Sequence, residues 1–451
     1  MGFVALALVF GGGGSSAPVS ELILELIAVA TAGLWLWQER SGGAVQTDRR
    51  IWLLAVLVLI VPAMQLFPLP PALWTALPGR AIEHDSLAVV GAAGQWMPWS
   101  VAPSRTLASL LALAPPLLAM ALVASLGSSG RAWVALAVAV TVLASMILGS
   151  LQLAAGESGG WRPYGLDNVG FLNGFQANRN SQADVILIGL AMAATSLGWI
   201  ARDVRRWTRH GLFAAIAALY VLCCLLTGSR AGIALIPLGL AGAILAYSPR
   251  RTGWRRAGLG LAAVALLGIL GYALLHGMPA FERVIARFSF ASDFRTELWE
   301  DTRFAIAQYW PFGSGMGTFR PVFIAAERLE VVDPTMPVRA HDEYLELALE
   351  AGAFGLVALG FAVLCLGWMA WSAWRKTAAG GRGQTAAALA TLTIIALHSL
   401  VDYPLRSMAL ACLAGVAAGL LARTPEIHAN RTSRDRLAIG TNNPDREFAS
   451  T

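Results

Sequence analysis

Apolar runs long enough to cross a lipid bilayer recur along this chain and constrain its fold more than any other feature. A transmembrane helix needs about 20 mostly apolar residues. Segments close to that length are residues 2–17, 20–38, 51–67, 105–126, 132–153, 183–200, 211–227, 232–247, 257–275, 348–374, 384–401 and 407–422. Only 13% of the 451 residues are charged, against roughly 25% in a soluble domain. The sequence therefore predicts an all-α polytopic membrane protein with about twelve transmembrane helices.

Basic residues between the apolar runs set the predicted orientation. Arginine-rich clusters lie at 202–210 and 248–256, and such clusters in short loops mark the cytoplasmic side. Because these clusters lie in loops between the predicted spans, the net charge of +6 does not indicate a nucleic-acid partner. Because the number of spans is even, both termini are predicted in the cytoplasm, with residues 423–451 forming a disordered polar tail.

Three longer polar segments are predicted on the outer face: residues 68–104, 154–182 and 276–347. We expect nine transmembrane helices with short loops in 1–275, a large periplasmic loop in 276–347 and three further helices in 348–422. The large loop is rich in Arg, although positive charge usually stays inside. Long loops cross the membrane regardless of charge, so these arginines serve something other than orientation.

The densest cluster of titratable residues, "AHDEYLELALEAGAFG", lies where the large loop meets the next apolar run. If the residues after Asp342 are helical, Glu343, Glu346 and Glu350 share one face, and Asp342 caps the helix. His341 then lies at the helix entrance, where an imidazole is suited to proton transfer. The alternative is a hydrated helix start with no chemistry. A zinc helix is not predicted, because no second His follows at i+4.

Two arginine-containing motifs also fall on the predicted outer face. "TGSRAG" places Arg230 between two apolar spans, where an Arg either is functional or extends its head group to water. "SDFRTELWEDTRF" brings Arg295 and Arg303 to helical spacing in the large loop. Arg is the side chain best suited to bidentate phosphate contacts.

Two more polar motifs share that face. "HSLVDYPLR" brings His398 and Asp402 to i, i+4, either as a polar tie between spans or as site residues. "NGFQANRN" contains Asn178, Arg179 and Asn180, and suits either turns or contacts with hydroxyl and phosphate oxygens. With the other motifs, these residues predict a cationic, histidine-containing site beside lipid, suited to a lipid-linked phosphate donor.

The ordered set of motifs resembles the signature of the O-antigen ligase and polymerase superfamily. It is carried by the "NRN" loop, "GSRAG", "PFGSGMGTF", "AHDEYLELALEAGAFG" and "HSLVDYPL", and it covers nearly the whole chain. The resemblance implies a membrane C-type glycosyltransferase fold in the bacterial inner membrane, with its active site on the periplasmic face. The implied reaction moves a glycan from undecaprenyl diphosphate to an acceptor hydroxyl, with inversion and without a metal or other cofactor.

The resemblance also implies roles for single residues. His341 matches the proposed general base. Arg230 and Arg295 match arginines that bind the donor diphosphate, and Arg303 is assigned there with them. The candidate glycan or acceptor contacts are Asn178, Arg179, Asn180, Glu343, Tyr344, His398 and Asp402. One departure is Asp342, which follows His341 where family members often have Asn or Ser.

The acceptor stays open on this resemblance. Ligases glycosylate a lipid A core sugar in lipopolysaccharide biosynthesis, polymerases extend another lipid-linked repeat, and related oligosaccharyltransferases modify a protein Ser or Thr. We predict a ligase-like reaction, with a repeat-unit polymerase as the alternative. A flippase for lipid-linked glycans is a further alternative, although the sequence shows neither the mid-span charges nor the inverted repeats typical of transporters.

Overall fold

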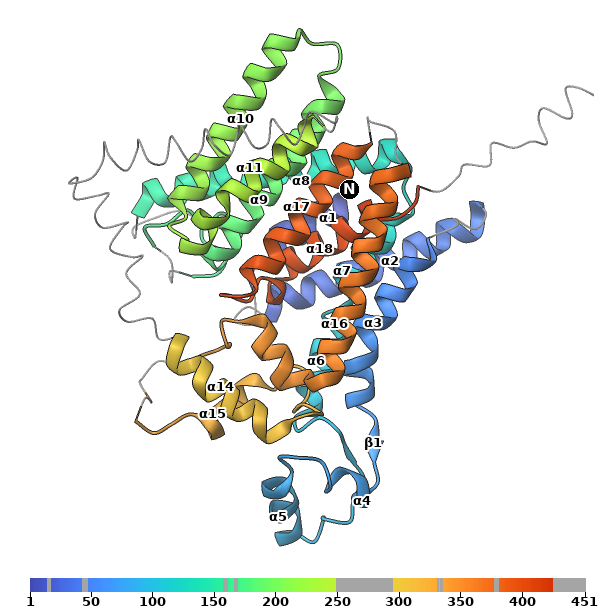
Figure 1. Cartoon of the computed structure of the whole chain (residues 1–451), viewed down its shortest axis with the longest axis vertical. Helices are drawn as coiled ribbons and strands as arrows, with labels where there is room; N and C mark the ends of the chain where they lie inside the picture. The colour runs from blue at the N-terminus through green and yellow to red at the C-terminus, as the bar shows by residue number, and fades with distance from the viewer. Residues whose placement is uncertain are drawn as a thin grey trace, which may run out of the picture.

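The computed structural model describes residues 1–13, 18–42, 48–156, 161–165, 169–248, 295–330, 332, 336–376 and 381–424. Regular structure in this part of the chain is almost entirely helical (Figure 1), which confirms the all-α prediction. The strands described are the two-residue β1 (Pro68–Leu69) and β2 (Met97–Pro98), which pair antiparallel. The predicted span at 257–275 and nearly all of the predicted tail lie outside the described residues.

Most of the described helices form one bundle. Its helices are α1 (Gly2–Phe10), α2 (Pro18–Gly42), α3 (Arg49–Gln65), α6 (Pro103–Leu111), α7 (Ala114–Ala124), α8 (Ser128–Ala155), α9 (Arg179–Ile200), α10 (Arg206–Leu226), α11 (Arg230–Tyr247), α16 (Glu343–Lys376), α17 (Arg382–His398) and α18 (Met408–Leu421). Within the described ranges, seven helical segments are long and apolar enough to cross a membrane. This agrees with a polytopic membrane protein.

Two predicted spans differ in detail from the helices. The first was expected over 2–17, but α1 ends at Phe10, where a run of glycines begins; glycine favours helix ends over helix interiors. The span expected over 105–126 is interrupted between α6 and α7. Pro115 and Pro116 follow the break, and proline cannot donate the hydrogen bond that would continue the preceding turn.

The centre of the bundle is α9, whose residues 181–194 are buried on every side, as expected for a helix that other helices surround. Small residues let its neighbours approach closely. A side chain at Gly232 on α11 would collide with Ala183 on α9, and one at Gly242 would collide with Ala390 on α17. Packing through small residues is typical of helices in membranes.

The outer surface of the bundle is apolar. Along α16, Val357, Phe361, Leu364 and Trp368 form one stripe in which each residue is between 57% and 70% exposed. Their spacing of four, three and four residues puts them on one side of the helix. A continuous apolar stripe of this size on a helix surface matches contact with lipid tails.

Hydrogen bonds between helix ends define two ends of the bundle. At the first end, the backbone N–H of Ala409 donates to the carbonyl of Gly11 at 2.9 Å, and that of Leu172 donates to Leu226 at 3.1 Å. At the opposite end, the guanidinium of Arg131 donates to backbone carbonyls at the ends of α7 and α18. We call the first the site end, because the segments described next attach to it.

The described parts of the polar segments predicted on the outer face attach to the site end. They contain α4 (Pro71–Trp74), α5 (Ala81–Val89), α14 (Arg295–Tyr309) and α15 (Phe319–Ala326), which lie beyond the bundle in Figure 1. The backbone N–H of Val101 donates to Ser314 at 2.9 Å, and that of Ser100 donates to Gln65 at 2.9 Å. The Gln65 amide in turn donates to the Glu350 carbonyl at 2.8 Å. These bonds fix the large loop against α3 and α16.

A second, smaller core lies under the large loop. Leu298 and Ala305 of α14, Phe319 and Phe323 of α15, and Leu349 of α16 are all buried in it. Because this core includes a residue from the first part of α16, it anchors the loop on the segment that follows His341. The described part of the loop from 295 to 330 is therefore a packed helical layer at the site end.

Candidate active site

His341 lies directly before α16 in a backbone conformation that L residues rarely adopt. Its φ is +51°, in the left-handed region, and such residues cluster at functional sites. The turn is held on both sides. The N–H of Ala340 donates to Glu346 Oε2 at 3.2 Å, and its carbonyl accepts from the Trp299 indole at 3.0 Å. Asp342 fixes the other side by capping α16.

The predicted cap at Asp342 is confirmed. Its Oδ1 accepts the backbone N–H groups of Tyr344 at 2.9 Å and Leu345 at 3.0 Å. Burial raises the pKa of Asp342, while these N–H groups and the positive charge of Arg303 act in the opposite direction. Arg303 of α14 therefore acts on the start of α16, one residue from His341.

The His341 side chain is held by the segment that follows α17. Its Nδ1 lies 3.1 Å from Asp402 Oδ1, and its ring meets the Tyr403 ring edge-on with centroids 4.9 Å apart. The Asn180 amide donates to Asp402 Oδ2 at 2.6 Å, which fixes the carboxylate. An imidazole whose Nδ1–H donates to a fixed carboxylate carries its basic lone pair on Nε2.

The environment keeps Asp402 ionised. Burial would raise the pKa of Asp402, but the hydrogen bond to His341, the charge of His398 and the Asn180 hydrogen bond bring it below its usual value. The carboxylate is almost completely buried, whereas the His341 side chain is 22% exposed. The pair thus combines a buried, fixed carboxylate with an accessible imidazole.

His398 lies behind Asp402, away from solvent. Its Nδ1 is 2.6 Å from Asp184 Oδ1 on α9, and its Nε2 is 4.0 Å from Asp402 Oδ2. The i, i+4 spacing indicated only the second of these partners. Sequence reasoning missed Asp184, although a carboxylate two residues after "NRNSQ", at the start of an apolar run, was a usable signal.

The remaining asparagine and arginine positions at this end have structural partners. Asn178 caps α9 by accepting the N–H of Asn180 at 2.8 Å. The Arg179 guanidinium lies 4.3 Å above the Phe171 ring. Arg230 is the first residue of α11, after the capping Ser229, and Gly232 packs on Ala183. The first turn of α11 therefore lies against the first turns of α9, which carry Asn180 and Asp184.

Other candidate contacts join α16 to α17. Glu343 Oε2 accepts the Ser399 hydroxyl at 2.7 Å, and the Tyr344 hydroxyl donates to the Ala396 carbonyl at 2.8 Å. Arg295, the first residue of α14, acts electrostatically on His398. These contacts join the predicted residues of α16 to the end of α17, and Arg295 of α14 acts on the same helix end.

A buried ionic cluster supports the segment before His341. Arg406 Nη2 lies 2.8 Å from Glu350 Oε2 and 3.0 Å from Glu346 Oε1. Arg339 Nη1 lies 2.8 Å from the same Glu346 oxygen, and Glu350 Oε1 accepts the N–H of Phe319 at 3.0 Å. Both glutamates are fully buried. The predicted acidic face of this helix thus turns inward and joins the large loop to the segment before α18.

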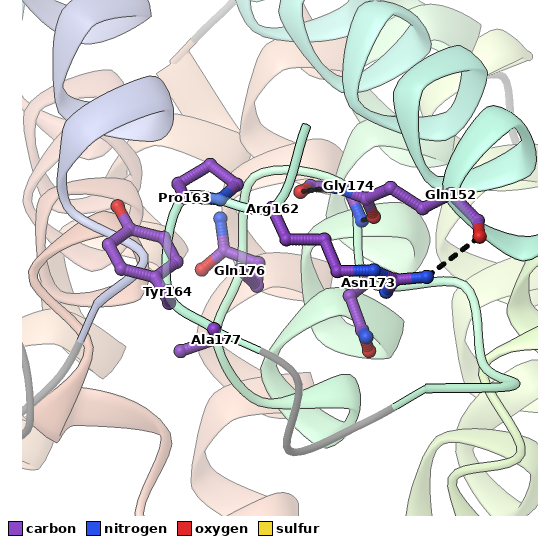
Figure 2. A pocket seen from close by; sticks show the side chains of 9 residues that line it. Gln152, Arg162, Pro163, Tyr164, Asn173, Gly174, Gln176 and Ala177 are labelled. Atoms are coloured by element: carbon purple, nitrogen blue, oxygen red, sulfur yellow. Dashed lines mark hydrogen bonds between the residues drawn. The ribbon is translucent and has the colours of Figure 1, made fainter. Parts of the chain in front are cut away.

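A small polar pocket lies in the loop between α8 and α9 (Figure 2). The Gln152 amide donates to the Gly174 carbonyl at 3.1 Å, and the Gln152 carbonyl accepts from Arg162 at 2.8 Å. The cavity measures about 20 Å³, which is room for about one water. These side chains therefore fold the loop and do not enclose a sugar.

One comparison with known protein families agrees with the motifs. Residues 212–360 match the family model described as O-antigen ligase, a region that contains Arg230, Arg295, Arg303 and His341. No curated protein matches the chain. A solved chain from "Structural coordination of polymerization and crosslinking by a peptidoglycan synthase complex" is 19% identical, with a TM-score of 0.45 over 84% of this chain and 98% of that one. The family match over these residues supports the resemblance of the chain to the O-antigen ligase and polymerase superfamily of membrane glycosyltransferases.

Proposed function

We propose that this chain is an O-antigen ligase-like enzyme that moves a glycan from undecaprenyl diphosphate to an acceptor hydroxyl, a lipid A core sugar, on the periplasmic face. The observation that carries the proposal is the His341–Asp402 pair. It unites an accessible imidazole with a buried carboxylate, at the end of an apolar bundle where a lipid anchor would hold the donor. This is the arrangement that a general base for an incoming hydroxyl requires.

In the proposed reaction the imidazole of His341 and the carboxylate of Asp402 have separate roles. His341 Nε2 takes the proton of the acceptor hydroxyl while the oxygen attacks the anomeric carbon from the face opposite the diphosphate. The bond between that carbon and the diphosphate oxygen breaks, and its electron pair leaves with the diphosphate. Asp402 stabilises the imidazolium that forms, as a fixed carboxylate does behind a catalytic His. A single displacement inverts the anomeric configuration.

Departure of the diphosphate requires nearby positive charge more than it requires a general acid. A diphosphate is a weakly basic leaving group, so the developing negative charge is best stabilised by fixed cations. Arg230, Arg295 and Arg303 are the residues we assign to it. Support comes from their elements: α11 begins beside the first turns of α9, and of the two α14 arginines Arg295 acts on His398 and Arg303 acts on Asp342.

Acceptor choice separates the ligase from the alternatives. Purified chain is incubated with a lipid-linked glycan and either lipid A core or a second lipid-linked repeat. We expect the glycan on the lipid A core. Growth of the lipid-linked chain would instead support the polymerase, and movement of intact donor across vesicles without transfer would support a flippase.

Arg230→Lys should lower kcat/KM for the lipid-linked donor about tenfold or more, although the charge is retained. A lysine cannot form the bidentate contact that a guanidinium makes with a phosphate, and a hydrogen bond to a charged group contributes roughly 1.5–3 kcal/mol. The control is Arg202→Lys, at an exposed position between α9 and α10. Equal kcat/KM values for the two variants would show that Arg230 does not contact the donor.

Asp402→Asn should lower single-turnover transfer by roughly 10–100-fold with donor affinity kept. An amide can donate to Nδ1 and so favours the tautomer in which Nε2 carries the proton, which cannot act as a base. Asp85→Asn is the matched control, because the Asp85 side chain is 81% exposed on α5. A wild-type rate for Asp402→Asn would contradict the role of the pair.

A further inference from the structure

A second histidine–carboxylate pair lies directly behind the first and takes no part in the reaction described above. His398 from the end of α17 is 1% exposed, and Asp184 from α9 is fully buried. Their side chains lie 2.6 Å apart, and the other His398 nitrogen is 4.0 Å from Asp402. Ionisable groups in the interior of a membrane protein are energetically unfavourable, so their presence is a sign of function.

His398 stands between two carboxylates, Asp184 on one side and Asp402 on the other, and opposite charges at this range favour the protonated imidazole. A neutral His398 would leave two buried carboxylates without a compensating charge between them. The other titratable or charged groups facing the cluster are His341, Tyr403, Cys224 and Arg295.

The position of His398 determines which charge of its ion pair lies nearer to Asp402. Its imidazolium is next to Asp402, whereas Asp184 lies on the far side of the imidazole ring. Asp402 therefore experiences the positive end of the ion pair more strongly than the negative end. A positive charge at this place opposes the binding of a further proton by the His341–Asp402 pair.

We propose that Asp184 and His398 are positioning residues, whose buried ion pair keeps Asp402 ionised and keeps His341 neutral and ready to accept a proton. His398 holds its proton throughout and transfers none. The inference rests on the proposed role of His341 as the base, and it assigns to His398 a role other than contact with a glycan. The competing explanation is a purely structural tie between α9 and α17.

The double variant Asp184→Asn/His398→Gln separates the two explanations. Both replacements are neutral amides of similar size that can hydrogen-bond to each other, so a structural tie is retained while the charges are removed. If the charge matters, loss of the imidazolium makes the His341–Asp402 pair bind its proton more tightly. The pH at which His341 becomes neutral then moves upward, by about one unit.

Reaction with diethyl pyrocarbonate measures this directly, because the reagent attacks only neutral imidazole. Protein in detergent is treated between about pH 5 and 9, and modification of His341 is followed by peptide mass spectrometry. We expect the His341 midpoint to rise by about one unit in the double variant, and transfer well below that midpoint to fall about tenfold and recover at high pH. His84, 44% exposed on α5, is the internal control, and its midpoint should stay unchanged.

An unchanged His341 midpoint in a folded double variant would overturn the proposal in favour of the structural tie. His398→Gln alone leaves Asp184 charged. The His341 midpoint in this single variant should therefore rise at least as far as in the double variant. Should neither variant fold, nitrogen NMR of histidine-labelled wild-type protein decides: two protonated His398 nitrogens near neutral pH support the proposal, and a neutral ring refutes it. Chemical modification requires no glycan transfer, so failure of the proposed function and failure of this inference are distinguishable.

Discussion

Replacing His341 with alanine should lower turnover by about 10²–10⁴-fold, the usual contribution of a general base. The methyl group cannot accept the acceptor proton, and Asp402 is too buried to take over this role. Donor binding should persist, because the arginines assigned to the diphosphate are unchanged. The loss should therefore appear in kcat and in single-turnover transfer, with the donor Kd kept.

His84→Ala provides the matched control for this experiment. His84 also lies next to a carboxylate, with Nδ1 3.2 Å from Asp85 Oδ1, but it belongs to the exposed α5 in the segment 68–104. Its replacement should leave transfer unchanged. A wild-type rate for His341→Ala would remove His341 from the mechanism, whatever the acceptor.

The same assay with EDTA tests the predicted metal independence. We expect the wild-type rate to persist in the chelator. Within the residues that the structure describes, no three His, Cys, Asp or Glu side chains are grouped so as to hold a metal ion. Loss of activity in EDTA, restored by added metal, would contradict the mechanism proposed for His341.

The helices were predictable because the physics that makes them is local. Long apolar runs must satisfy their backbone groups internally in lipid, and the residues that begin and end each helix lie next to it in the sequence. Asp342 was identified as a cap from its position before an acidic turn, and the structure gives it two backbone partners. The same local logic fails where a run is long but interrupted, as at the glycines after Phe10 and at the break between α6 and α7, which two prolines follow.

The partners of the site histidines were only partly predictable, because they come from distant segments. His341 and Asp402 are 61 positions apart, and Asp184 and His398 are 214 apart. Spacing within one helix pointed from His398 to Asp402, yet the closer carboxylate is on α9. A sequence pattern reports which residues share a helix face. It does not report which neighbouring helix that face meets.

The acidic face of α16 shows the same limit. Its i, i+3, i+7 spacing correctly placed Glu343, Glu346 and Glu350 on one side. On sequence alone that side could equally be a hydrated surface. What decides the matter is Arg406, which lies 56 residues after Glu350 and reaches into the same space. The sequence indicates the acidic face, and only the structure shows the cation that it binds.

Arg406→Met should lower the free energy of unfolding by about 3–5 kcal/mol, the usual cost of removing one partner from a buried ion pair. Burial disfavours the charged guanidinium, but Glu346, Glu350 and Glu343 outweigh it and raise the pKa of Arg406 above its usual value. With methionine in its place, Glu350 would be left in the interior without its cation, and Glu346 would retain only Arg339. Unfolding by denaturant in detergent measures the loss.

Two further variants identify the cause of that loss. Arg320→Met removes an exposed arginine of α15 and should change stability by no more than about 0.5 kcal/mol. Adding Glu346→Gln and Glu350→Gln to Arg406→Met should recover part of the stability, because no carboxylate then stays buried without its arginine. If Arg406→Met were as stable as Arg320→Met, the cluster would not hold the large loop. Glu346 also accepts the N–H of Ala340. The same carboxylate therefore stabilises the fold and holds the turn at His341.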